Sequence, residues 1–444
     1  MSSEWPIVTV DEICELIVDC VNKTAPVVAY ATPYRMIRTT NIREGRINLE
    51  SCRYVDEDTY KKWTRRAKLQ YGDVLLTREA PIGEVGFVDV PEGLFLGQRV
   101  MQYRADIRVL HPRFLHYSFL SPSLQHQFGS HEGSGSVVSH IRVGDCFKFK
   151  ISLPPLDVQK GIAELLGAID DRITLLRETN VTLEAIAQAL FKSWFVDFDP
   201  VRAKAQGLEP EGMDAATAAL FPDSFEESEL GLVPSGWMVM RFLDACDLQG
   251  GAQPPASTFV DEARDGYVRL LQIRDFSSDA HKTFIPDTAK LKKVTEDDVL
   301  IGRYGSASGD KAKDSLGRVC RGLSGSYNVA LMKLNPLEVG REFAFQMVSD
   351  SRFYGYLQGV SSKAVQSGFS KAELGKYKVV VPPRAVSALF ESFGTVIWTR
   401  LKAGKAMQRQ LSELRDTLLP RLIAGQLRLP EAEASIENIL SEAI

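Results

Sequence analysis

Six side chains in this sequence carry the chemistry for reading the edges of DNA bases. Arginine suits guanine, whereas asparagine and glutamine suit adenine. The six are Arg78, Gln98 and Arg99 in the first half of the chain, and Arg303, Tyr304 and Asn328 in the second. Each of these residue types is also common on ordinary protein surfaces, so a role in binding depends on the elements that bring them together.

A glycine-rich loop could contact phosphate. Residues 302–309 (Gly-Arg-Tyr-Gly-Ser-Ala-Ser-Gly) are followed by Lys311, Lys313 and Arg318. Backbone N–H groups of such a loop, together with nearby cations, can hold a phosphate. No helical pattern follows directly, which favours a phosphodiester over a mononucleotide as the ligand. A tight turn after a strand is the alternative interpretation.

Two further polar segments could approach a polyanion. The run from Arg35 to Lys68 has ten Lys or Arg against five Asp or Glu. A solvated surface would give the same charge pattern. Residues 133–142 (Gly-Ser-Gly-Ser-Val-Val-Ser-His-Ile-Arg) form a polar loop whose glycines would allow close contact with a ligand backbone.

The motifs that would give the chain its own catalysis are missing. Residues 403–406 (Ala-Gly-Lys-Ala) lack the first glycine and the hydroxyl of a phosphate-binding loop. Asp199 and Asn335 are each followed by a single proline, unlike the Asn/Asp-Pro-Pro-aromatic motif of amino-methyltransferases. Asp287 is not followed by the Asp/Glu-x-Lys that a metal-dependent nuclease needs. The histidine pairs 111/116 and 126/131 have no cysteine nearby. We therefore expect no catalytic residue, no metal site and no cofactor in this chain.

Two long helices are predicted from heptad spacing, and they would position these polar segments. The first series of helical positions, called the first seam, is Ile162, Leu166, Ile169, Ile173, Leu176, Asn180, Leu183, Ala187, Leu190 and Trp194. Adding 228 to each number gives the second seam: Phe390, Gly394, Ile397, Leu401, Gly404, Gln408, Leu411, Arg415, Leu418 and Leu422. Such a pattern is typical of a long helix packed on another long helix. The chain is therefore a duplicated unit, and each copy ends in a long helix.

The second seam is less regular than the first. Gly394, Gly404 and Arg415 replace apolar residues in it. Asn180 and Gln408 fall at equivalent seam positions, and we expect them to help set the register of the helices at some cost in stability.

Shorter segments repeat inside the globular parts. Residues 269–274 correspond to 38–43, residues 298–305 to 73–80, and residues 361–370 to 133–142. We expect strands at 73–77 and 147–153 and a helix within 110–128. The predicted organisation is a mixed α/β part over 1–153, a helix over 154–200, an acidic linker over 201–234 with one short helix near 215–220, a second mixed α/β part over 235–381, a helix over 382–427 interrupted at Pro420 and Gly425, and a tail over 428–444.

Composition and charge further limit the functions that fit this chain. The chain has 444 residues, which suits two or more domains, and a net charge of −4. Residues 156–230 alone hold 15 acidic and 6 basic groups, so the two globular parts are mildly basic. No apolar run could span a membrane, and the six cysteines have no CxxC spacing. These features predict a cytoplasmic protein with no membrane partner, since scattered cysteines are typical of reduced thiols.

The sequence resembles the specificity subunits of type I restriction–modification enzymes over nearly its whole length. The matching pieces include PPLDVQKGIA at 154–163, LFKSWFVDFDP at 190–200, LGLVPSGW at 230–237 and LRDTLLPRLIAGQL at 414–427. The resemblance implies an α+β fold in which two target-recognition domains are joined by two long antiparallel, coiled-coil helices, with an internal pseudo-two-fold repeat. Each domain would read one half of a bipartite, asymmetric site in double-stranded DNA.

The polar segments and the two seams described above supply the candidate residues for these roles. The expected DNA-binding residues are Arg38, Thr39, Asn41, Arg43, Arg65, Arg66, Arg78, Gln98, Arg99, Ser139, His140, Arg142, Gln272, Arg274, Arg303, Tyr304, Lys311, Lys313, Asn328, Lys363, Gln366 and Ser367. The expected subunit interface is Ile162, Leu166, Ile169, Ile173, Leu176, Asn180, Leu183, Leu190, Trp194, Ile397, Leu401, Gln408, Leu411, Leu418 and Leu422.

The implied partners carry the chemistry. Two adenine-N6 methyltransferase subunits would dock on the helices, and restriction (helicase–nuclease) subunits would join through them. S-adenosylmethionine, ATP and Mg²⁺ would bind those subunits and not this chain. The second copy departs from the family because residues 382–388 (Pro-Pro-Arg-Ala-Val-Ser-Ala) lack the usual glutamine, so docking on the two sides could differ.

Two other functions fit parts of the sequence. A stand-alone nuclease or methyltransferase would bind S-adenosylmethionine or a metal by itself. A coiled-coil adaptor would bind proteins only, and the arginine-rich loops of both copies weigh against it.

Overall fold

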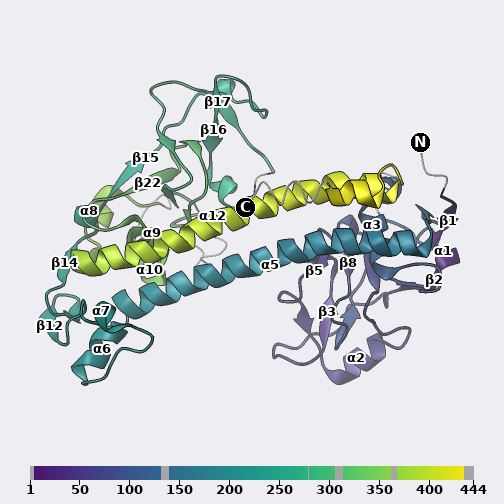
Figure 1. Ribbon diagram of the computed structural model, residues 1–444, viewed down its shortest axis with the longest axis horizontal. Helices are drawn as coiled ribbons and strands as arrows, with labels where there is room; N and C mark the ends of the chain where they lie inside the picture. Colours follow the sequence, from purple (N-terminus) through teal and green to yellow (C-terminus); the bar gives the residue numbers. More distant parts are fainter. Residues whose placement is uncertain (1–4, 132–139, 279, 306–313, 362–367, 435–444) are drawn as a thin grey trace. The chain divides into compact units, whose positions relative to one another are not determined.

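The computed structural model describes residues 5–131, 140–278, 280–305, 314–361 and 368–434 (Figure 1). It divides into two compact units, each described by itself. Unit 1 comprises Met1–Arg177 and Ala406–Ile444, and unit 2 comprises Glu178–Lys405. The helices α5 (Leu156–Phe195) and α12 (Arg384–Ile423) each contribute one segment to both units.

Unit 1 is a mixed α/β body built on these helices. Its other elements are β1 (Ile7–Thr9), α1 (Val10–Ile13), β2 (Cys14–Asp19), β3 (Arg35–Ile37), η1 (Thr39–Asn41), β4 (Ile42–Arg43), β5 (Arg46–Ile47), β6 (Arg53–Tyr54), α2 (Glu57–Trp63), β7 (Val74–Arg78), β8 (Ile82–Phe87), β9 (Leu94–Leu96), β10 (Val100–Ala105), α3 (Pro112–Leu120), α4 (Pro122–Gly129) and β11 (Lys150–Ser152).

Unit 2 repeats this plan after a connecting segment. Its elements are α6 (Asp199–Ala205), α7 (Ala215–Ala218), β12 (Phe225–Ser228), β13 (Gly231–Pro234), β14 (Met238–Arg241), α8 (Phe242–Ala245), β15 (Cys246–Gly250), η2 (Ala256–Thr258), β16 (Tyr267–Leu271), η3 (Ile273–Phe276), β17 (Phe284–Pro286), β18 (Lys293–Val294), β19 (Val299–Gly302), β20 (Val319–Cys320), β21 (Gly325–Tyr327), β22 (Leu331–Pro336), α9 (Arg341–Ser349), α10 (Ser351–Ser361), α11 (Lys371–Leu374) and β23 (Lys378–Val381).

The sheet topology confirms the predicted repeat. One sheet of unit 1 has the order β2-β10-β7-β8, and one sheet of unit 2 has the order β15-β22-β19-β20, with antiparallel pairs throughout. In both units, a strand near the start of the globular part pairs antiparallel with its last strand: β1 with β11, and β14 with β23. The parallel pairs β3–β9 and β16–β21 also correspond. The same strands therefore pair in the same order in both halves of the chain.

The seams of α5 and α12 pack inside the hydrophobic cores. In unit 1, Ile162, Leu166, Ile169 and Ile173 are buried in one core cluster with Leu411, Leu418 and Leu422. In unit 2, Trp194 packs against Phe390, with 6.1 Å between the ring centroids. Asn180 lies beside Gly404, so the partner number falls as the α5 number rises, and the two segments run antiparallel. The predicted fold class, with two mixed α/β domains joined by two long antiparallel helices, is confirmed.

The irregular positions of the second seam each face a polar group. A Cβ atom at Gly404 would lie 2.6 Å from Oδ1 of Asn180, and one at Gly394 would lie 2.6 Å from Cβ of Glu342. Arg415 donates to Asp170 of α5 at 2.8 Å. The second seam is thus fitted to specific neighbours, and its glycine and arginine positions do not reflect poor packing.

Several predicted boundaries differ from the structure. The first helix ends at Phe195, because Phe198 adopts a left-handed backbone (φ 57°) before α6. The helix predicted within 110–128 is two helices, since the extended Ser121 precedes Pro122. Pro420 lies within α12, which continues to Ile423, so it does not interrupt the helix.

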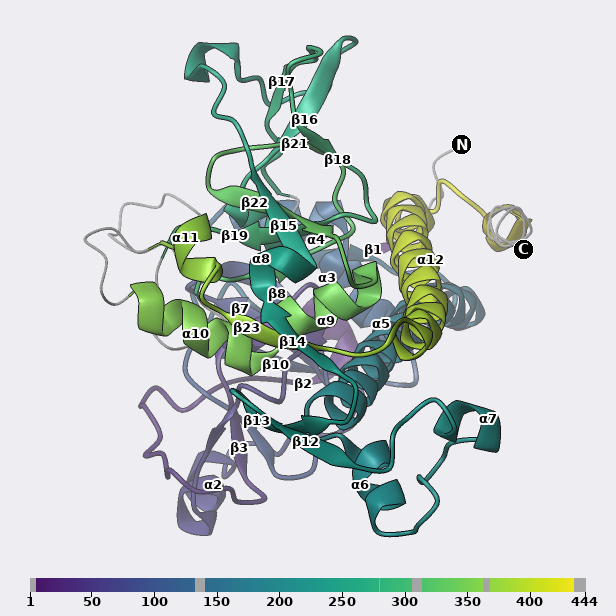
Figure 2. The same ribbon diagram turned by 90° about the vertical axis from the view of Figure 1, so that its left-hand side faces the viewer.

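The connector between the copies has more structure than predicted. Its predicted short helix is α7, but it also contains the antiparallel hairpin β12–β13. In Figure 2 this hairpin lies beside α6, and both lie apart from β15 and β22. Phe221 and Val233 of the connector are buried, with exposed fractions of 2% each, so the segment is anchored to unit 2.

Candidate nucleic-acid interface

The first turn predicted to bind DNA is held by its own side chains. Asn41 accepts a hydrogen bond from the backbone N–H of Arg38 at 2.9 Å and donates to the Ser51 hydroxyl at 2.7 Å. Its exposed fraction is 1%, and Thr39 is also buried. The prediction that Asn41 and Thr39 contact DNA is therefore wrong, because the turn uses Asn41 to satisfy its backbone. Arg38 also belongs to the turn and donates to the Ser51 carbonyl at 2.9 Å.

Unit 2 forms the same turn with different residues. The backbone N–H of Gln272 donates to Asp275 at 2.7 Å, and Asp275 is buried. Gln272 and Arg274 both donate to the Thr283 hydroxyl, at 3.3 and 2.8 Å. Arg274 is exposed, so its guanidinium remains available on the surface while Asp275 holds the turn.

The other arginines of the basic run lie on the surface. Arg43 donates to the Thr39 carbonyl at 2.8 Å and lies 3.8 Å from the Glu84 carboxylate. Arg66 forms an ion pair with Asp19. Arg65 is exposed and makes no hydrogen bond or ion pair within the part of the chain that the structure describes. Exposed ion pairs are worth little, so these side chains can exchange partners for a phosphate.

A cluster of predicted residues gathers where β7 ends, and we call it the first arginine site: Arg78, Gln98, Arg99, His140 and Arg142. The backbone N–H of Arg78 donates to the Arg99 carbonyl at 2.8 Å, and the Ile141 N–H donates to the Arg78 carbonyl at 3.0 Å. The Arg78 guanidinium also donates to the Ile141 carbonyl at 3.0 Å. Three segments far apart in the sequence therefore meet at one strand end.

The exposed side chains of this site are arginines. Arg99 has an exposed side chain that pairs with Glu79 at 3.0 Å, and Arg142 is exposed. Arg99 itself has a left-handed backbone (φ 69°). Gln98 accepts a hydrogen bond from the Thr24 hydroxyl at 3.3 Å. The site offers guanidinium groups to an anionic ligand.

The equivalent strand end in unit 2 carries a second arginine site, formed by Arg303, Tyr304 and Asn328. The backbone N–H of Arg303 donates to the Ala330 carbonyl at 2.8 Å, which matches the bond between Arg78 and Arg99. The Arg303 Nε donates to the Phe369 carbonyl at 3.3 Å, and its guanidinium lies 4.8 Å from the centroid of the Tyr304 ring. Asn328 accepts from the Ala330 N–H at 3.1 Å. The backbone plan is repeated, but the side chains differ.

Six predicted residues lie outside the described residues: Ser139, Lys311, Lys313, Lys363, Gln366 and Ser367. All come from the polar loops predicted to approach a ligand.

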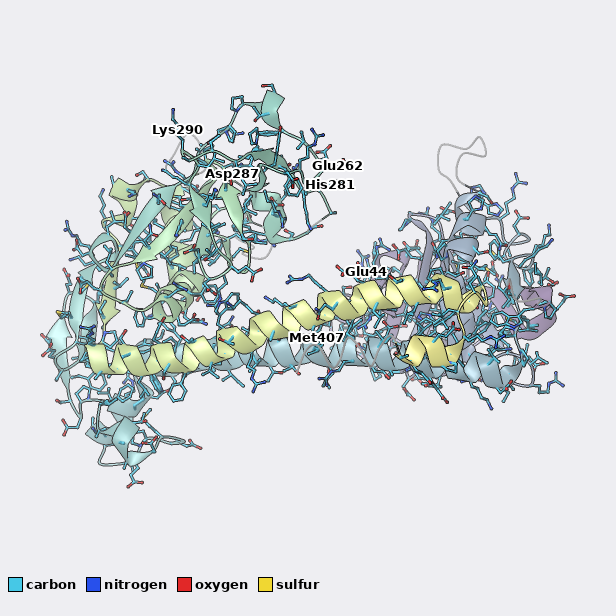
Figure 3. The ribbon with its side chains drawn as sticks, turned by 45° about the horizontal axis from the view of Figure 1, so that its top comes forward. Glu44, Glu262, His281, Asp287, Lys290 and Met407 are labelled. Carbon is cyan, nitrogen blue, oxygen red and sulfur yellow. The ribbon has the colours of Figure 1, made fainter. Side chains whose placement is uncertain are left out.

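The sequence interpretation did not single out an exposed edge of unit 2 that carries lysines beside acidic residues. Figure 3 places Lys290 and His281 at the end of the unit that holds β16 and β17. Lys290, Lys282 and His281 are exposed there, while Lys292 donates to the Gly250 carbonyl at 2.7 Å and Lys293 pairs with Asp287. The three lysines at 290, 292 and 293 lie close together in the sequence, and this clustering could have pointed to the edge.

His116 is buried among aromatic rings, whereas His111 is half-buried. His116 contacts the rings of Phe87 and Tyr117, with centroid distances of 5.5 and 5.2 Å, and burial lowers its pKa to about 4. Burial also lowers the pKa of His111. The described residues contain no group of three His, Cys, Asp or Glu side chains placed to hold a metal ion. No helix among them is long and apolar enough to cross a bilayer.

The predicted subunit interface needs correction. Most of the seam residues assigned to it are buried within this chain, so another subunit cannot contact them: Ile162, Leu166, Ile169, Ile173, Asn180, Trp194, Leu401, Leu411, Leu418 and Leu422. Leu176, Leu183, Leu190, Ile397 and Gln408 are half-buried. Apolar side chains outside the seams are exposed instead, namely Leu175, Val181 and Ile186 on α5 and Phe393 and Val396 on α12.

Comparisons with known proteins agree with this architecture. Residues 2–185 match the family model described as the type I restriction modification DNA specificity domain. The chain is 24% identical to the type I restriction enzyme HindI specificity subunit of Haemophilus influenzae, over 81% of this chain and 87% of that protein. It is 23% identical to the MjaIX specificity subunit of Methanocaldococcus jannaschii, over 81% and 78% of the two chains.

A solved structure shares the fold. The type I restriction–modification S subunit from M. genitalium aligns with a TM-score of 0.58 at 15% identity, over 95% of this chain and 96% of that one. Residues 2–185 therefore match the DNA specificity domain of this family, and the chain is similar over most of its length to type I restriction–modification specificity subunits.

Proposed function

We propose that this chain is the non-catalytic DNA-specificity subunit of a type I restriction–modification complex, and that it reads a bipartite, asymmetric site. The observation that carries the proposal is the pair of arginine sites. Equivalent strand ends repeat the same backbone hydrogen bond, from Arg78 to the Arg99 carbonyl and from Arg303 to the Ala330 carbonyl, yet one carries Arg78, Arg99 and Arg142 and the other Arg303, Tyr304 and Asn328. Two similar scaffolds with different side chains suit two different half-sites.

The partner subunits would supply the chemistry. Two adenine methyltransferase subunits would dock on the exposed apolar residues of α5 and α12, which include Ile186 and Val396. Exposed apolar groups of this kind, outside the packed seams, are typical of protein interfaces. Restriction subunits would join through the methyltransferases, and S-adenosylmethionine, ATP and Mg²⁺ would bind these partners.

The experiment is methylome sequencing with the chain and its methyltransferase partner. Wild type should methylate one bipartite motif. Arg303→Ala should relax one half of that motif and Arg78→Ala the other, because losing a base contact costs about 1–3 kcal/mol. Arg108→Ala is the matched control, since that arginine is exposed and pairs only with Asp106. Methylation of a single continuous motif, or changes in both halves from one variant, would contradict the proposal.

A further inference from the structure

In each unit, one residue of the long helix contacts the globular part, and these two residues occupy the same position of the repeat. Residues 170 and 398 differ by 228, the offset that relates the two seams. Asp170 lies on α5 within unit 1, and Trp398 lies on α12 within unit 2. Each makes polar contacts between its helix and the recognition body of the same unit.

In unit 1, Asp170 binds three elements through hydrogen bonds. Its carboxylate accepts from the Tyr117 hydroxyl of α3 at 2.8 Å and from Arg415 of α12 at 2.8 Å. Its backbone carbonyl accepts from Arg46 of β5 at 3.2 Å. Tyr117 is buried, and Arg415 is about a quarter exposed. This anchor is polar and borders a cleft of about 810 Å³, so solvent reaches part of it.

In unit 2, Trp398 forms the equivalent anchor with a different chemistry. Its ring lies 3.9 Å from the Arg321 guanidinium, which lies 3.9 Å from the Phe345 ring on its other side. Arg321 pairs with Glu342 of α9 at 2.7 Å, and both side chains are almost fully buried. The indole N–H donates to Asp297 at 2.8 Å, and Lys402 donates to the same carboxylate at 2.5 Å.

These contacts fix orientation more than they add stability. A buried ion pair contributes little net free energy, but it is satisfied in only one geometry, so it selects one packing over its neighbours. An arginine held between two aromatic rings and a carboxylate tolerates little rotation of α9 on α12. None of the anchor residues belongs to either arginine site.

We infer that Asp170 and Trp398 are positioning residues that fix how each recognition domain is held on its helix, and thereby set the number of base pairs between the two half-sites. The inference rests on the proposed function. One base pair adds about 3.4 Å along the duplex. It also turns the half-site by about 35° around the duplex axis, since one helical turn holds about 10–10.5 base pairs. A domain freed to shift by a few ångströms and to rotate at its anchor would therefore accept a spacer one base pair longer or shorter, while its base contacts stay the same.

The test measures methylation by the reconstituted complex on duplexes that share both half-sites and differ only in spacer length. The readout is the rate with a spacer one base pair longer or shorter, divided by the rate with the natural spacer. Trp398→Ala removes the aromatic contact and the indole hydrogen bond and should raise this ratio about tenfold. Trp398→Phe keeps the ring and removes the indole hydrogen bond, whereas Asp297→Asn keeps an acceptor oxygen and removes the charge that pairs with Lys402; each should raise the ratio about threefold.

Thr399→Ala is the matched control, because Thr399 is exposed on the same helical turn and donates only to the Thr395 carbonyl. It should leave the ratio unchanged. Asp170→Asn, which changes the anchor of unit 1, should raise the ratio by about as much as Trp398→Phe. A uniform drop in rate at every spacer length, with the ratio unchanged in the folded Phe and Asn variants, would show a merely structural role and overturn the inference. If wild type recognised no bipartite site at all, the proposed function itself would fail.

Discussion

The helices α3 in unit 1 and α9 in unit 2 meet the long helices at equivalent points, but with opposite charge. Arg113 of α3 lies over Gly167 of α5, where a Cβ atom would be 2.6 Å from its guanidinium. Glu342 of α9 lies over Gly394 of α12, where a Cβ atom would be 2.6 Å from Cβ of Glu342. In both units a glycine lets a charged residue approach the long helix closely. The two glycines lie one position apart in the repeat, and the sign of the charge is reversed.

The charged groups are also neutralised differently. Arg113 lies 3.6 Å from Asp171, whose side chain is 70% exposed, whereas Glu342 pairs with Arg321 in a buried contact at 2.7 Å. Burial lowers the pKa of Arg321, which shows the cost of its desolvation. Removing one partner of the charged pair should therefore lower the stability of unit 2 more than that of unit 1, since a buried charge is costly to leave unpaired.

Glu342→Ala should give the largest effect. It leaves the Arg321 guanidinium buried without its carboxylate, so unit 2 should lose about 3–5 kcal/mol of stability. Hydrogen–deuterium exchange on the full chain would show faster exchange throughout 235–381. Glu229→Ala, which removes an exposed ion pair with Lys378 in the same unit, should cost less than about 1 kcal/mol. Equal effects of the two substitutions would contradict the difference we draw between buried and exposed pairs.

The titration of a buried histidine should affect the stability of unit 1 and not that of unit 2. The position in α9 that corresponds to His116 is Phe345. Burial holds the folded-state pKa of His116 at about 4, below its ordinary 6.5, although Asp170 opposes this shift and Arg113, Arg415 and Arg46 support it. The unfolded chain therefore binds the proton first, and the contribution of His116 is lost as pH falls below about 6.5.

By pH 5 this loss should reach about 2 kcal/mol in unit 1. Urea unfolding of wild type and of His116→Phe at pH 7.5 and pH 5 measures it, because other titrating groups cancel in the difference. The substitution copies the residue that unit 2 uses and removes the titration, so the variant should be less sensitive to acid than wild type. An identical pH dependence in both proteins would contradict the attribution of the acid sensitivity to His116.

The repeat explains which features the sequence could predict. Heptad spacing and an offset of 228 were enough for two long helices and a duplicated fold, because apolar periodicity reports directly on buried faces. The same spacing made Gly394, Gly404 and Arg415 look like defects. Their partners Glu342, Asn180 and Asp170 lie far away in the sequence, and only the fold brings them together.

The DNA-contact candidates show a similar limit. Arg78 and Arg303 were singled out because arginine suits guanine, and the structure places both at equivalent strand ends. Asn41 has the side chain of an adenine-reading residue, yet it is used to close a turn. An Asn side chain bonds local backbone as readily as a base, so its type alone cannot separate the two roles.

The smallest predicted effect tests whether Gly394 is fitted to its neighbour. Replacing glycine by alanine within a helix ordinarily stabilises a protein by about 0.5–1 kcal/mol. Gly355→Ala in α10 should show this gain, because a Cβ atom there would meet nothing within 4 Å. Gly394→Ala would push its methyl group to 2.6 Å from Cβ of Glu342, so overpacking should outweigh the helical gain and destabilise unit 2 by about 1 kcal/mol. Thermal unfolding of the two variants should therefore shift in opposite directions. A stabilised Gly394→Ala would mean that α9 moves on α12 at little cost, and the buried ion pair of Arg321 and Glu342 would then not hold unit 2 in one orientation.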